Sequence, residues 1–449
     1  MTIDKEQLVK LCDKIYQNNI IDKSYYCQYD VKRGLRNKNG TGVLVGLTHI
    51  GDVQGYKVED GAKVPAEGKL YYRGIDVEDL VNACIKEDRI GYEEASYLLL
   101  FGDLPNKEEL EDYKKLLGQH RELPPNFLST NILATPSQDI MNKLGRVILS
   151  LYSSDPNPDD ISIENVLIQS IKLIAQFPVL IAYAYQAKAR EFDNESMHIH
   201  YPDPELGTAE NLLRLIRPDG KYTEIEAKLL DLAMILHAEH GGGNNSAFTT
   251  HVISSTATDT YAVISAAIGS LKGPKHGGAN KAVFEMMLDL KANVKDLTDF
   301  DEVEKYLIKL LKGEAFDKSG LIYGMGHAVY TLSDPRATLL KDMARKLAEE
   351  KDLLDEFAVY DFIEKRAPQL FKEIRQDNKV ISANVDLYSG FIYNALNIPI
   401  ELCTPIFAAA RISGWCAHRI EEIVAGGRVI RPAYKNVRAA REYTPIAER

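Results

Sequence analysis

The sequence predicts a mostly α-helical protein with a large helical domain, a smaller helical domain and a short N-terminal β-hairpin region. Apolar residues recur at helical spacing along most of the chain, as at Ile225, Leu229 and Leu232. Gly, Val and Thr instead concentrate in residues 40–75, followed by polar turns, which is typical of a hairpin. Convincing strand–helix alternation is absent from the pattern, so a parallel sheet is not expected.

Charge distribution predicts the domain organisation. A chain of 449 residues exceeds the size at which a single core stops growing, so two domains are expected. Charge-rich helices crowd residues 289–380. We therefore predict a small domain at 278–387, inserted between the two parts of a large domain at 1–277 and 388–449.

Local signals predict where several helices begin. Thr223 and Glu226 form a capping-box pair. Asp334 followed by proline resembles an N-cap with proline at the first helical position. Thr404 followed by proline repeats that pattern and predicts the start of another long helix.

Composition excludes several classes of protein. The 54 basic and 65 acidic residues give a net charge of −11, whereas a nucleic-acid-binding protein needs a basic face. No run approaches the ~18 uninterrupted apolar residues of a membrane helix. The polar N-terminal residues predict no secretion signal. Five cysteines without a CxxC pair predict neither a disulfide framework nor a zinc site, and they fit the reducing cytoplasm.

Three turn-rich segments carry titratable side chains that suit proton transfer. They are Gly273–Asn280 with His276, Gly324–His327, and Asn384–Asp386. Glycine lets the backbone turn tightly and lets a ligand approach closely. Two histidines and one aspartate then supply acid and base groups.

His237 and His240 lie at i and i+3 on one helix face and allow three interpretations. They form a metal site, they pair with the helix dipole, or one of them projects into a substrate pocket. No third ligand is near and the motif is not HExxH, so no metal is predicted. Gly324–His327 lacks the third glycine of a dinucleotide fingerprint, and Gly241–Gly243 is not a phosphate-binding loop.

Three arginines indicate an anionic ligand: Arg336, Arg411 and Arg431. Arg411 lies in a run of alanines on an apolar helix face, where a charge is costly to bury unless it meets an anion. An internal salt bridge is the alternative. Because arginine binds carboxylates through a planar fork, several converging arginines favour a polycarboxylate.

Taken in order, the segments Leu236–Ser246, Gly273–Asn280, Gly324–His327 with Asp334–Arg336, and Asn384–Asp386 resemble the citrate synthase family. The resemblance runs from about Tyr71 to Arg431. It implies a nearly all-helical fold and an acyltransferase that makes citrate from oxaloacetate, acetyl-CoA and water, bringing acetyl groups into the tricarboxylic acid cycle. It implies no permanently bound cofactor, with acetyl-CoA as co-substrate, and a homodimer or higher homo-oligomer.

The resemblance also implies roles for individual residues. His276 hydrogen-bonds the thioester carbonyl, Asp386 removes the methyl proton and His327 polarises the oxaloacetate ketone. The expected substrate ligands are His240, Arg336, Arg411 and, from the neighbouring subunit, Arg431; Ser246 orients His276. The CoA-binding segment comprises Gly324, Met325, Gly326 and Ala328.

Ala328 and Thr331 depart from the family pattern, because many bacterial relatives have basic residues there. Basic contacts to the CoA phosphates are therefore expected elsewhere. A 2-methylcitrate synthase, which uses propionyl-CoA, is the nearest alternative, since one methylene is worth only ~1–3 kcal/mol of discrimination. A non-catalytic helical binding protein and a metal-dependent hydrolase built on His237 and His240 are further alternatives.

Overall fold

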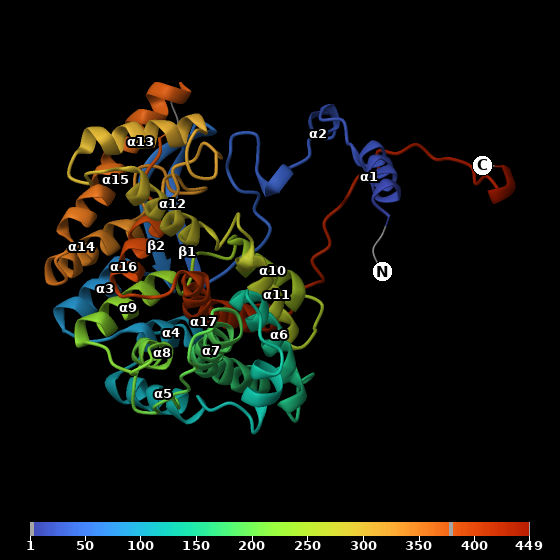
Figure 1. The fold of residues 1–449 in the computed structure, drawn as a ribbon. Helices are drawn as coiled ribbons and strands as arrows, with labels where there is room; N and C mark the ends of the chain where they lie inside the picture. The colour runs from blue at the N-terminus through green and yellow to red at the C-terminus, as the bar shows by residue number, and fades with distance from the viewer. Residues whose placement is uncertain (1–3, 377–379, 449) are drawn as a thin grey trace. The chain divides into compact units, whose positions relative to one another are not determined.

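The computed structural model describes residues 4–376 and 380–448, and α-helices dominate it, which confirms the predicted fold class (Figure 1). The helices of the first half are α1 (Lys5–Asn19), α2 (Ser24–Gln28), α3 (Val77–Lys86), α4 (Tyr92–Phe101), α5 (Lys107–Gln119), α6 (Ile140–Leu151), α7 (Ile163–Phe192), α8 (Thr208–Ile216) and α9 (Glu224–His237). Those of the second half are α10 (Asn245–Ser254), α11 (Thr260–Lys272), α12 (Ala279–Asn293), α13 (Phe300–Lys312), α14 (Pro335–Glu350), α15 (Leu354–Arg375), α16 (Val385–Ala395) and α17 (Cys403–Val424).

The predicted hairpin region contains a small sheet with strand order β1 (Gly51–Glu59), β2 (Ala62–Tyr72) and β3 (Ile75–Asp76). β2 and β3 are antiparallel, with Tyr72 opposite Ile75. The hairpin prediction is confirmed, but its strands begin only at Gly51. The preceding apolar stretch forms no strand, and Leu44 and Leu47 in it are exposed.

The described residues group into two units. The first contains residues 4–46, 58–63 and 431–448, and the second contains residues 47–57, 64–376 and 380–430. The domain boundaries predicted at 277/278 and 387/388 both fall inside the second unit and remain a prediction.

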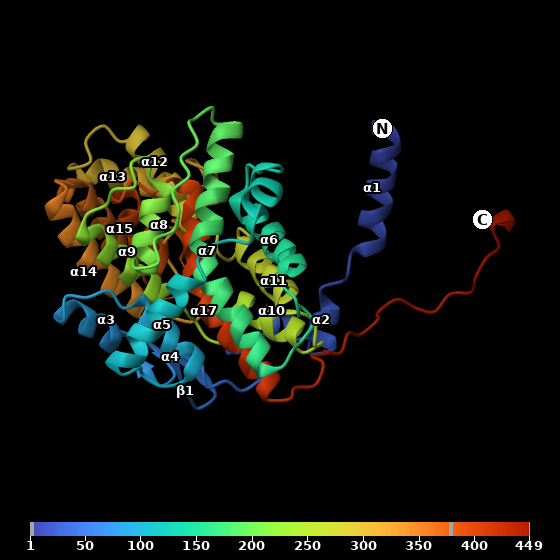
Figure 2. The same cartoon turned by 90° about the horizontal axis from the view of Figure 1, so that it is seen from below.

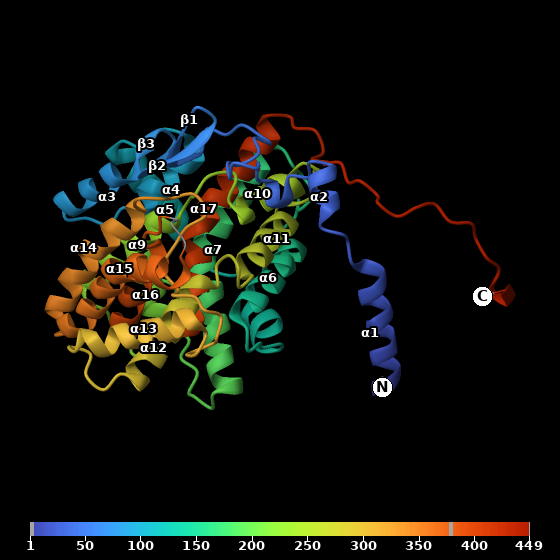
Figure 3. The ribbon, with the colours of Figure 1, turned by 90° about the horizontal axis from the view of Figure 1, so that it is seen from above.

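Two long buried helices, α7 and α17, form the centre of the second unit (Figure 2). α7 is long and apolar enough to cross a membrane by length and composition, but 83% of its most apolar window is buried inside the protein. Its burial therefore accounts for its hydropathy. α6, α10 and α11 lie on one side of this pair, and α12 to α16 gather on the other (Figure 3).

Two of the three predicted helix starts are confirmed. Thr223 and Glu226 form the capping box of α9, and Asp334 caps α14 with Pro335 in its first turn. The third long helix is also present, but Thr404 is not its cap, because α17 begins at Cys403 and its N-cap is Leu402. The Thr404 hydroxyl instead donates to the carbonyl of Gly277 at 3.1 Å, so it is not available as a cap.

α17 approaches the chain just after α9 very closely at Gly414. A β-carbon at this position would lie 2.5 Å from the Ala238 carbonyl oxygen and 2.5 Å from Oε2 of Glu239. Only glycine permits this approach without displacing the neighbouring backbone.

Candidate functional site

The His327 ring is oriented by its own loop. Its Nδ1 accepts hydrogen bonds from the backbone N–H groups of Val329 at 3.0 Å and Tyr330 at 3.1 Å. An accepting Nδ1 carries no proton, so the ring proton of the neutral imidazole resides on Nε2. His327 therefore presents a hydrogen-bond donor from Nε2.

The loop that follows His327 is fixed to the β-hairpin. The Thr331 hydroxyl donates to the carbonyl of Gly55 and accepts from the N–H of Ala66 at 3.0 Å. A β-carbon on Gly55 would lie 2.6 Å from Cα of Tyr330. Thr331 thus anchors the loop to the hairpin.

Asp334 joins Arg336 to the start of α16. Its two oxygens accept from Nε of Arg336 at 3.0 Å and from a terminal nitrogen of the same guanidinium at 2.8 Å. The oxygen at 2.8 Å also accepts from the backbone N–H of Val385 at 3.2 Å. Such two-point pairing fixes the plane of the Arg336 guanidinium beside the turn that carries Asp386.

Arg411 is fully buried and only partly hydrogen-bonded. Its Nε donates to the carbonyl of His237 at 2.6 Å, and its guanidinium lies over the Phe407 ring, 4.7 Å from the centroid. Both terminal nitrogens have no hydrogen-bond partner among the described residues. Burial lowers the pKa of Arg411 to about 10, so it remains a cation at neutral pH. An unsatisfied buried cation of this kind is suited to bind an anion.

His240 lies between the His327 loop and the arginines. Its ring is 5.3 Å from that of His327, centroid to centroid, and its Nε2 lies 3.3 Å from the Tyr330 hydroxyl. Burial, followed by the charges of Arg336 and of His327, holds the pKa of His240 well below its ordinary value. His240 is therefore neutral at physiological pH.

Glu239, the preceding residue, is fully buried. Burial raises the pKa of its carboxyl, but His418 and Arg411 outweigh that effect, and the pKa is lowered overall. Glu239 is therefore ionised and partly balances the charge of Arg411.

His276 and Ser246 form a second group with Trp415. Nε2 of His276 lies 3.2 Å from the Ser246 hydroxyl, which accepts from the indole N–H of Trp415 at 3.1 Å. The same hydroxyl also donates to Oδ1 of Asn244 at 2.9 Å. Burial, helped by Arg411, lowers the pKa of His276 to about 4, so this ring is also neutral at physiological pH.

Asp386 lies in the first turn of α16. Asn384 caps the helix by accepting from the backbone N–H of Asp386 at 3.0 Å, and its amide donates to the carbonyl of Gly326 at 2.9 Å. Burial raises the pKa of Asp386 to about 6, although Arg336 and the Asn280 amide oppose it. An aspartate with this pKa is ionised at neutral pH and is a stronger base than an ordinary one.

The structure brings most of the predicted residues together. The Tyr330 ring contacts His240, His327 and Arg336. The charges of Arg336 and Arg411 both lower the pKa of Asp386. In the predicted CoA segment, Gly324 and Gly326 both have positive φ, Met325 pairs with Ala383 in a β-bridge, and Ala328 is exposed.

Arg431 is exposed and belongs to the first unit, whereas the other predicted site residues belong to the second. Its contribution to the site stays a prediction.

His237 and His240 have different environments. His237 is fully buried and packs on Phe407, with ring centroids 4.2 Å apart, whereas His240 contacts Tyr330 and His327. This arrangement agrees with the interpretation in which His240 alone projects into a substrate pocket.

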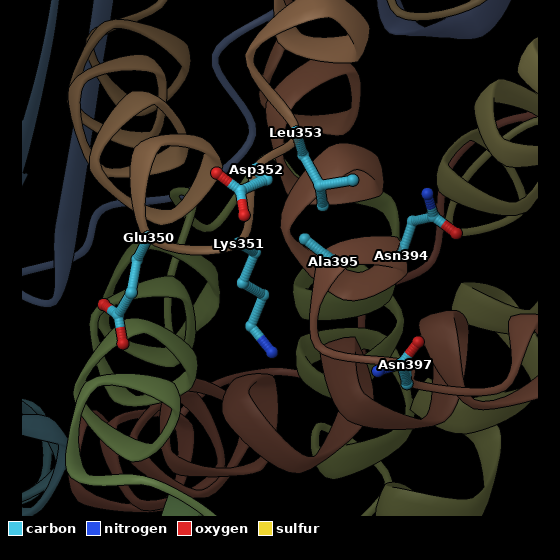
Figure 4. A pocket seen from close by; sticks show the side chains of 7 residues that line it. All are labelled: Glu350, Lys351, Asp352, Leu353, Asn394, Ala395 and Asn397. Carbon is cyan, nitrogen blue, oxygen red and sulfur yellow. The ribbon is translucent and has the colours of Figure 1, made fainter.

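A surface pocket of about 510 Å³ lies elsewhere, between the α14–α15 turn and the end of α16 (Figure 4). Its lining residues are Glu350, Lys351, Asp352, Leu353, Asn394, Ala395 and Asn397, and none of them is a predicted site residue. The titratable cluster, and not this pocket, defines the candidate site.

Sequence analysis missed four residues that support the site: Tyr330, Asp334 as the partner of Arg336, Asn280 and Trp415. Asp334 was recognised only as a helix cap. A carboxylate two positions before an arginine could have indicated the pair. No local signal links Trp415 to Ser246, 169 positions away.

Comparison with known proteins supports a family assignment. The family model described as "Citrate synthase, C-terminal domain" matches residues 38–433. The citrate synthase of Haloferax volcanii is 33% identical over 426 residues, which cover 94% of this chain and 99% of that protein. The 2-methylcitrate synthase 1 of Corynebacterium glutamicum is 32% identical, with coverages of 86% and 94%.

Solved structures give the same result. One is citrate synthase from the archaeon Thermoplasma acidophilum, solved as a ternary complex with carboxymethyl coenzyme A and oxaloacetate. It superposes with a TM-score of 0.76 and 26% identity, covering 93% of this chain and 99% of that one. Citrate synthase from Thermotoga maritima superposes with a TM-score of 0.72 and 31% identity, with the same coverages. The chain belongs to the citrate synthase family.

Proposed function

We propose that the protein condenses acetyl-CoA with oxaloacetate and water to give citrate and CoA. The observation that carries this proposal is the buried Arg411, whose two terminal nitrogens lack a partner among the described residues. The neutral His240 lies in the same buried region, next to the ionised Glu239. A dicarboxylate satisfies an arginine fork of this kind. The related Thermoplasma acidophilum enzyme was solved with oxaloacetate and a carboxymethyl form of coenzyme A.

Oxaloacetate binding follows from the cationic groups. Arg411 and Arg336 hold the carboxylates, and His240 adds a further hydrogen bond. The Nε2–H of His327 donates to the ketone oxygen, which makes the ketone carbon more electrophilic.

Proton abstraction is assigned to Asp386 and His276. Asp386 takes a proton from the acetyl methyl group while His276 donates a hydrogen bond to the thioester oxygen from Nδ1. For Nδ1 to carry the ring proton, the Ser246 hydroxyl must donate to Nε2 of His276 instead of to Asn244. The enol carbon then attacks the ketone, and water hydrolyses the citryl thioester to citrate and CoA.

Domain closure is assigned to residues 278–387, moving against 1–277 and 388–449. Of the site residues, His327, Arg336 and Asp386 lie in this proposed small domain, and His240, His276 and Arg411 lie in the proposed large domain. Closure would therefore assemble the site and exclude water during condensation. The backbone of 324–328 forms part of the CoA-binding surface, with its positive-φ glycines allowing close approach.

Release of the CoA thiol in the presence of oxaloacetate tests the function. Acetyl-CoA should be turned over faster than propionyl-CoA at equal concentration. Faster turnover of propionyl-CoA would instead identify a 2-methylcitrate synthase, the second candidate, which is motivated by the 32% identity to the Corynebacterium glutamicum enzyme. No thiol release from either substrate, with oxaloacetate binding intact, would favour a non-catalytic binding protein.

A homodimer or larger homo-oligomer is part of this proposal. α1 has no buried residue, and Leu8, Leu11 and Ile15 form an exposed stripe at helical spacing. Tyr434 and Tyr443 in the C-terminal tail are also exposed. An exposed apolar stripe of this kind favours contact with another chain.

Arg431 is predicted to act in the neighbouring subunit's site. Mixing an inactive Arg431→Ala chain with an inactive Asp386→Asn chain should then restore part of the activity. In a mixed dimer one site would carry both defects and the other neither. Mixed dimers that form but stay inactive would place Arg431 in its own subunit's site.

The reaction requires no permanently bound cofactor, and acetyl-CoA acts as co-substrate. We assign the enzyme to the cytoplasm and to the entry of acetyl groups into the tricarboxylic acid cycle. Cell fractionation with a thiol-release assay on each fraction tests the location.

A further inference from the structure

Two histidines outside the proposed active site face each other across two helices. His251 is on α10 and His418 is on α17. Nε2 of His251 lies 3.0 Å from Nδ1 of His418, and the ring centroids are 4.9 Å apart. His418 is fully buried, and the His251 side chain is 13% exposed.

The outer nitrogen of each ring faces a carboxylate. Nδ1 of His251 lies 2.8 Å from Oε2 of Glu422, and Nε2 of His418 lies 3.1 Å from Oε1 of Glu239. An ionised carboxylate only accepts hydrogen bonds, so it favours a ring proton on the nitrogen that faces it. Nδ1 of His251 meets Glu422 in this way, which leaves a lone pair on its Nε2. Nε2 of His418 and Oε1 of Glu239 have no hydrogen-bond partner among the described residues despite their 3.1 Å separation.

The 3.0 Å between Nε2 of His251 and Nδ1 of His418 suits either one shared proton or one metal ion bound to both rings. A metal ion with nitrogen ligands at about 2.0–2.1 Å spaces two of them by roughly this distance. Backing of each metal-binding histidine by a carboxylate is the usual second layer of such sites.

Glu421 supplies a third ligand. Its Oε1 accepts from the backbone N–H of His49 at 2.7 Å, which holds the carboxylate in place. Its Oε2 lies 3.9 Å from Nδ1 of His418 and has no hydrogen-bond partner among the described residues. The three donor atoms of His251, His418 and Glu421 lie within 4.8 Å of one another.

The local charge also favours a metal ion. The carboxylates of Glu239, Glu421 and Glu422 surround this pair of rings. The side chains of Glu421 and Glu422 are only 14% and 15% exposed, so water screens them poorly. A divalent ion offsets more negative charge than a single shared proton does.

We propose that His251, His418 and Glu421 bind one divalent transition-metal ion of the zinc class, with water completing its coordination. Imidazole and carboxylate ligands suit this class of ion. The site cross-links α10 to α17. It also fixes Glu239, which lies next to His240, so the metal ion acts as a structural clamp behind the oxaloacetate pocket. This inference departs from the metal-free chain predicted from the sequence.

Metal binding to the purified full-length chain tests the proposal directly. Protein stripped with a chelator should bind one Co²⁺ per chain with visible ligand-field absorption, and Zn²⁺ should displace it. Zn²⁺ should also raise the Tm of the stripped protein. These readouts do not depend on turnover. Metal binding can therefore fail while the proposed function holds, and the proposed function can fail while the metal binds.

Variants locate the site. His251→Gln and Glu421→Gln should each abolish the Co²⁺ absorption, and Glu422→Gln, which keeps all three ligands, should weaken binding by roughly 10–100-fold. His120→Gln, at the C-cap of α5, is the matched control and should bind as the parent does. Far-UV circular dichroism checks that each variant is folded. Absence of Co²⁺ and Zn²⁺ binding, or equal binding by folded His251→Gln and the control, would overturn the proposal.

Discussion

Burial shifts the pKa values of Asp386 and His276, the two groups to which we assign proton transfer, in opposite directions. It raises the pKa of the acid to about 6 and lowers that of the imidazole to about 4. Burial disfavours the charged form of each group. The charged form of the aspartate is the deprotonated carboxylate, whereas that of the histidine is the protonated imidazolium. Above about pH 6 the aspartate is ionised while the histidine stays neutral. One physical effect thus gives both a stronger carboxylate base and a neutral imidazole.

The pH dependence of kcat/KM should report Asp386. Below about pH 6 the carboxyl is protonated and cannot act as a base, so kcat/KM should fall tenfold per pH unit. Asn280→Ala removes an amide that lowers this pKa, so the acid limb of the pH profile should move to higher pH.

Asp386→Asn should lower kcat by roughly 10²–10⁴-fold while oxaloacetate still binds. Near-normal turnover by Asp386→Asn would remove this residue from the mechanism.

Arg411→Lys keeps the positive charge but loses the planar guanidinium that can hydrogen-bond a carboxylate at two points. A hydrogen bond to a charged group contributes ~1.5–3 kcal/mol, so oxaloacetate affinity should fall by roughly 10–150-fold. Titration calorimetry measures this affinity without turnover. Unchanged affinity would show that Arg411 has a purely structural role.

At the scale of elements, hydrogen bonds hold the His327 loop against the β-hairpin. Thr331 bonds to both strands, and Ser333 accepts from the N–H of Gly68 at 3.1 Å. Gly55 allows the loop backbone to lie directly on β1. The hairpin thereby fixes the position of the His327 loop, whose ring we propose polarises the ketone.

Gly55→Ala should therefore impair catalysis from outside the site. Its new methyl group would displace the loop at Tyr330, and a misplacement of about 1 Å can cost about 10²-fold in rate. Gly46→Ala is the matched control, since a β-carbon there meets nothing within 4 Å. Steady-state kinetics of both variants measures the effect, and equal kcat/KM values would contradict it.

At the scale of the whole molecule, an ion-pair network links the two proposed domains. Glu226 at the start of α9 pairs with Arg217 at 2.6 Å and with Lys351 after α14 at 2.7 Å. The Glu226 side chain is only 7% exposed. Burial alone raises the pKa of Glu226, but Arg217 and Lys351 outweigh it and lower the pKa to about 2.

This network should contribute to stability at neutral pH and lose that contribution in acid. The folded pKa lies below the unfolded one, so the contribution is complete above about pH 4.5 and disappears as the pH falls towards 2. Its size is on the order of 3 kcal/mol. Denaturant unfolding of the parent and Glu226→Gln should differ most at pH 7 and converge below pH 4. A constant difference across this range would rule out the linkage.

The residues to which proton transfer is assigned could be proposed from the sequence because they lie in short glycine- or asparagine-flanked segments. Helix starts at Thr223 and Asp334 were predictable because their capping signals are also local. The Asp334–Val385 contact and the Trp415–Ser246 contact depend on packing between residues 51 and 169 positions apart. The facing pair His251 and His418 is 167 positions apart and was missed as well. Thr404 shows the converse, since a strong local capping signal was overridden by a distant carbonyl at Gly277.

The close approach at Gly414 has an evolutionary consequence. Any side chain there would push α17 away from Ala238 and Glu239, and α17 carries Arg411 three positions earlier and His418 four positions later. A single substitution would thus disturb both an arginine fork and a histidine cluster. Even alanine would clash at this position, so a saturation library selected for growth without the enzyme's product in the medium should return glycine almost exclusively.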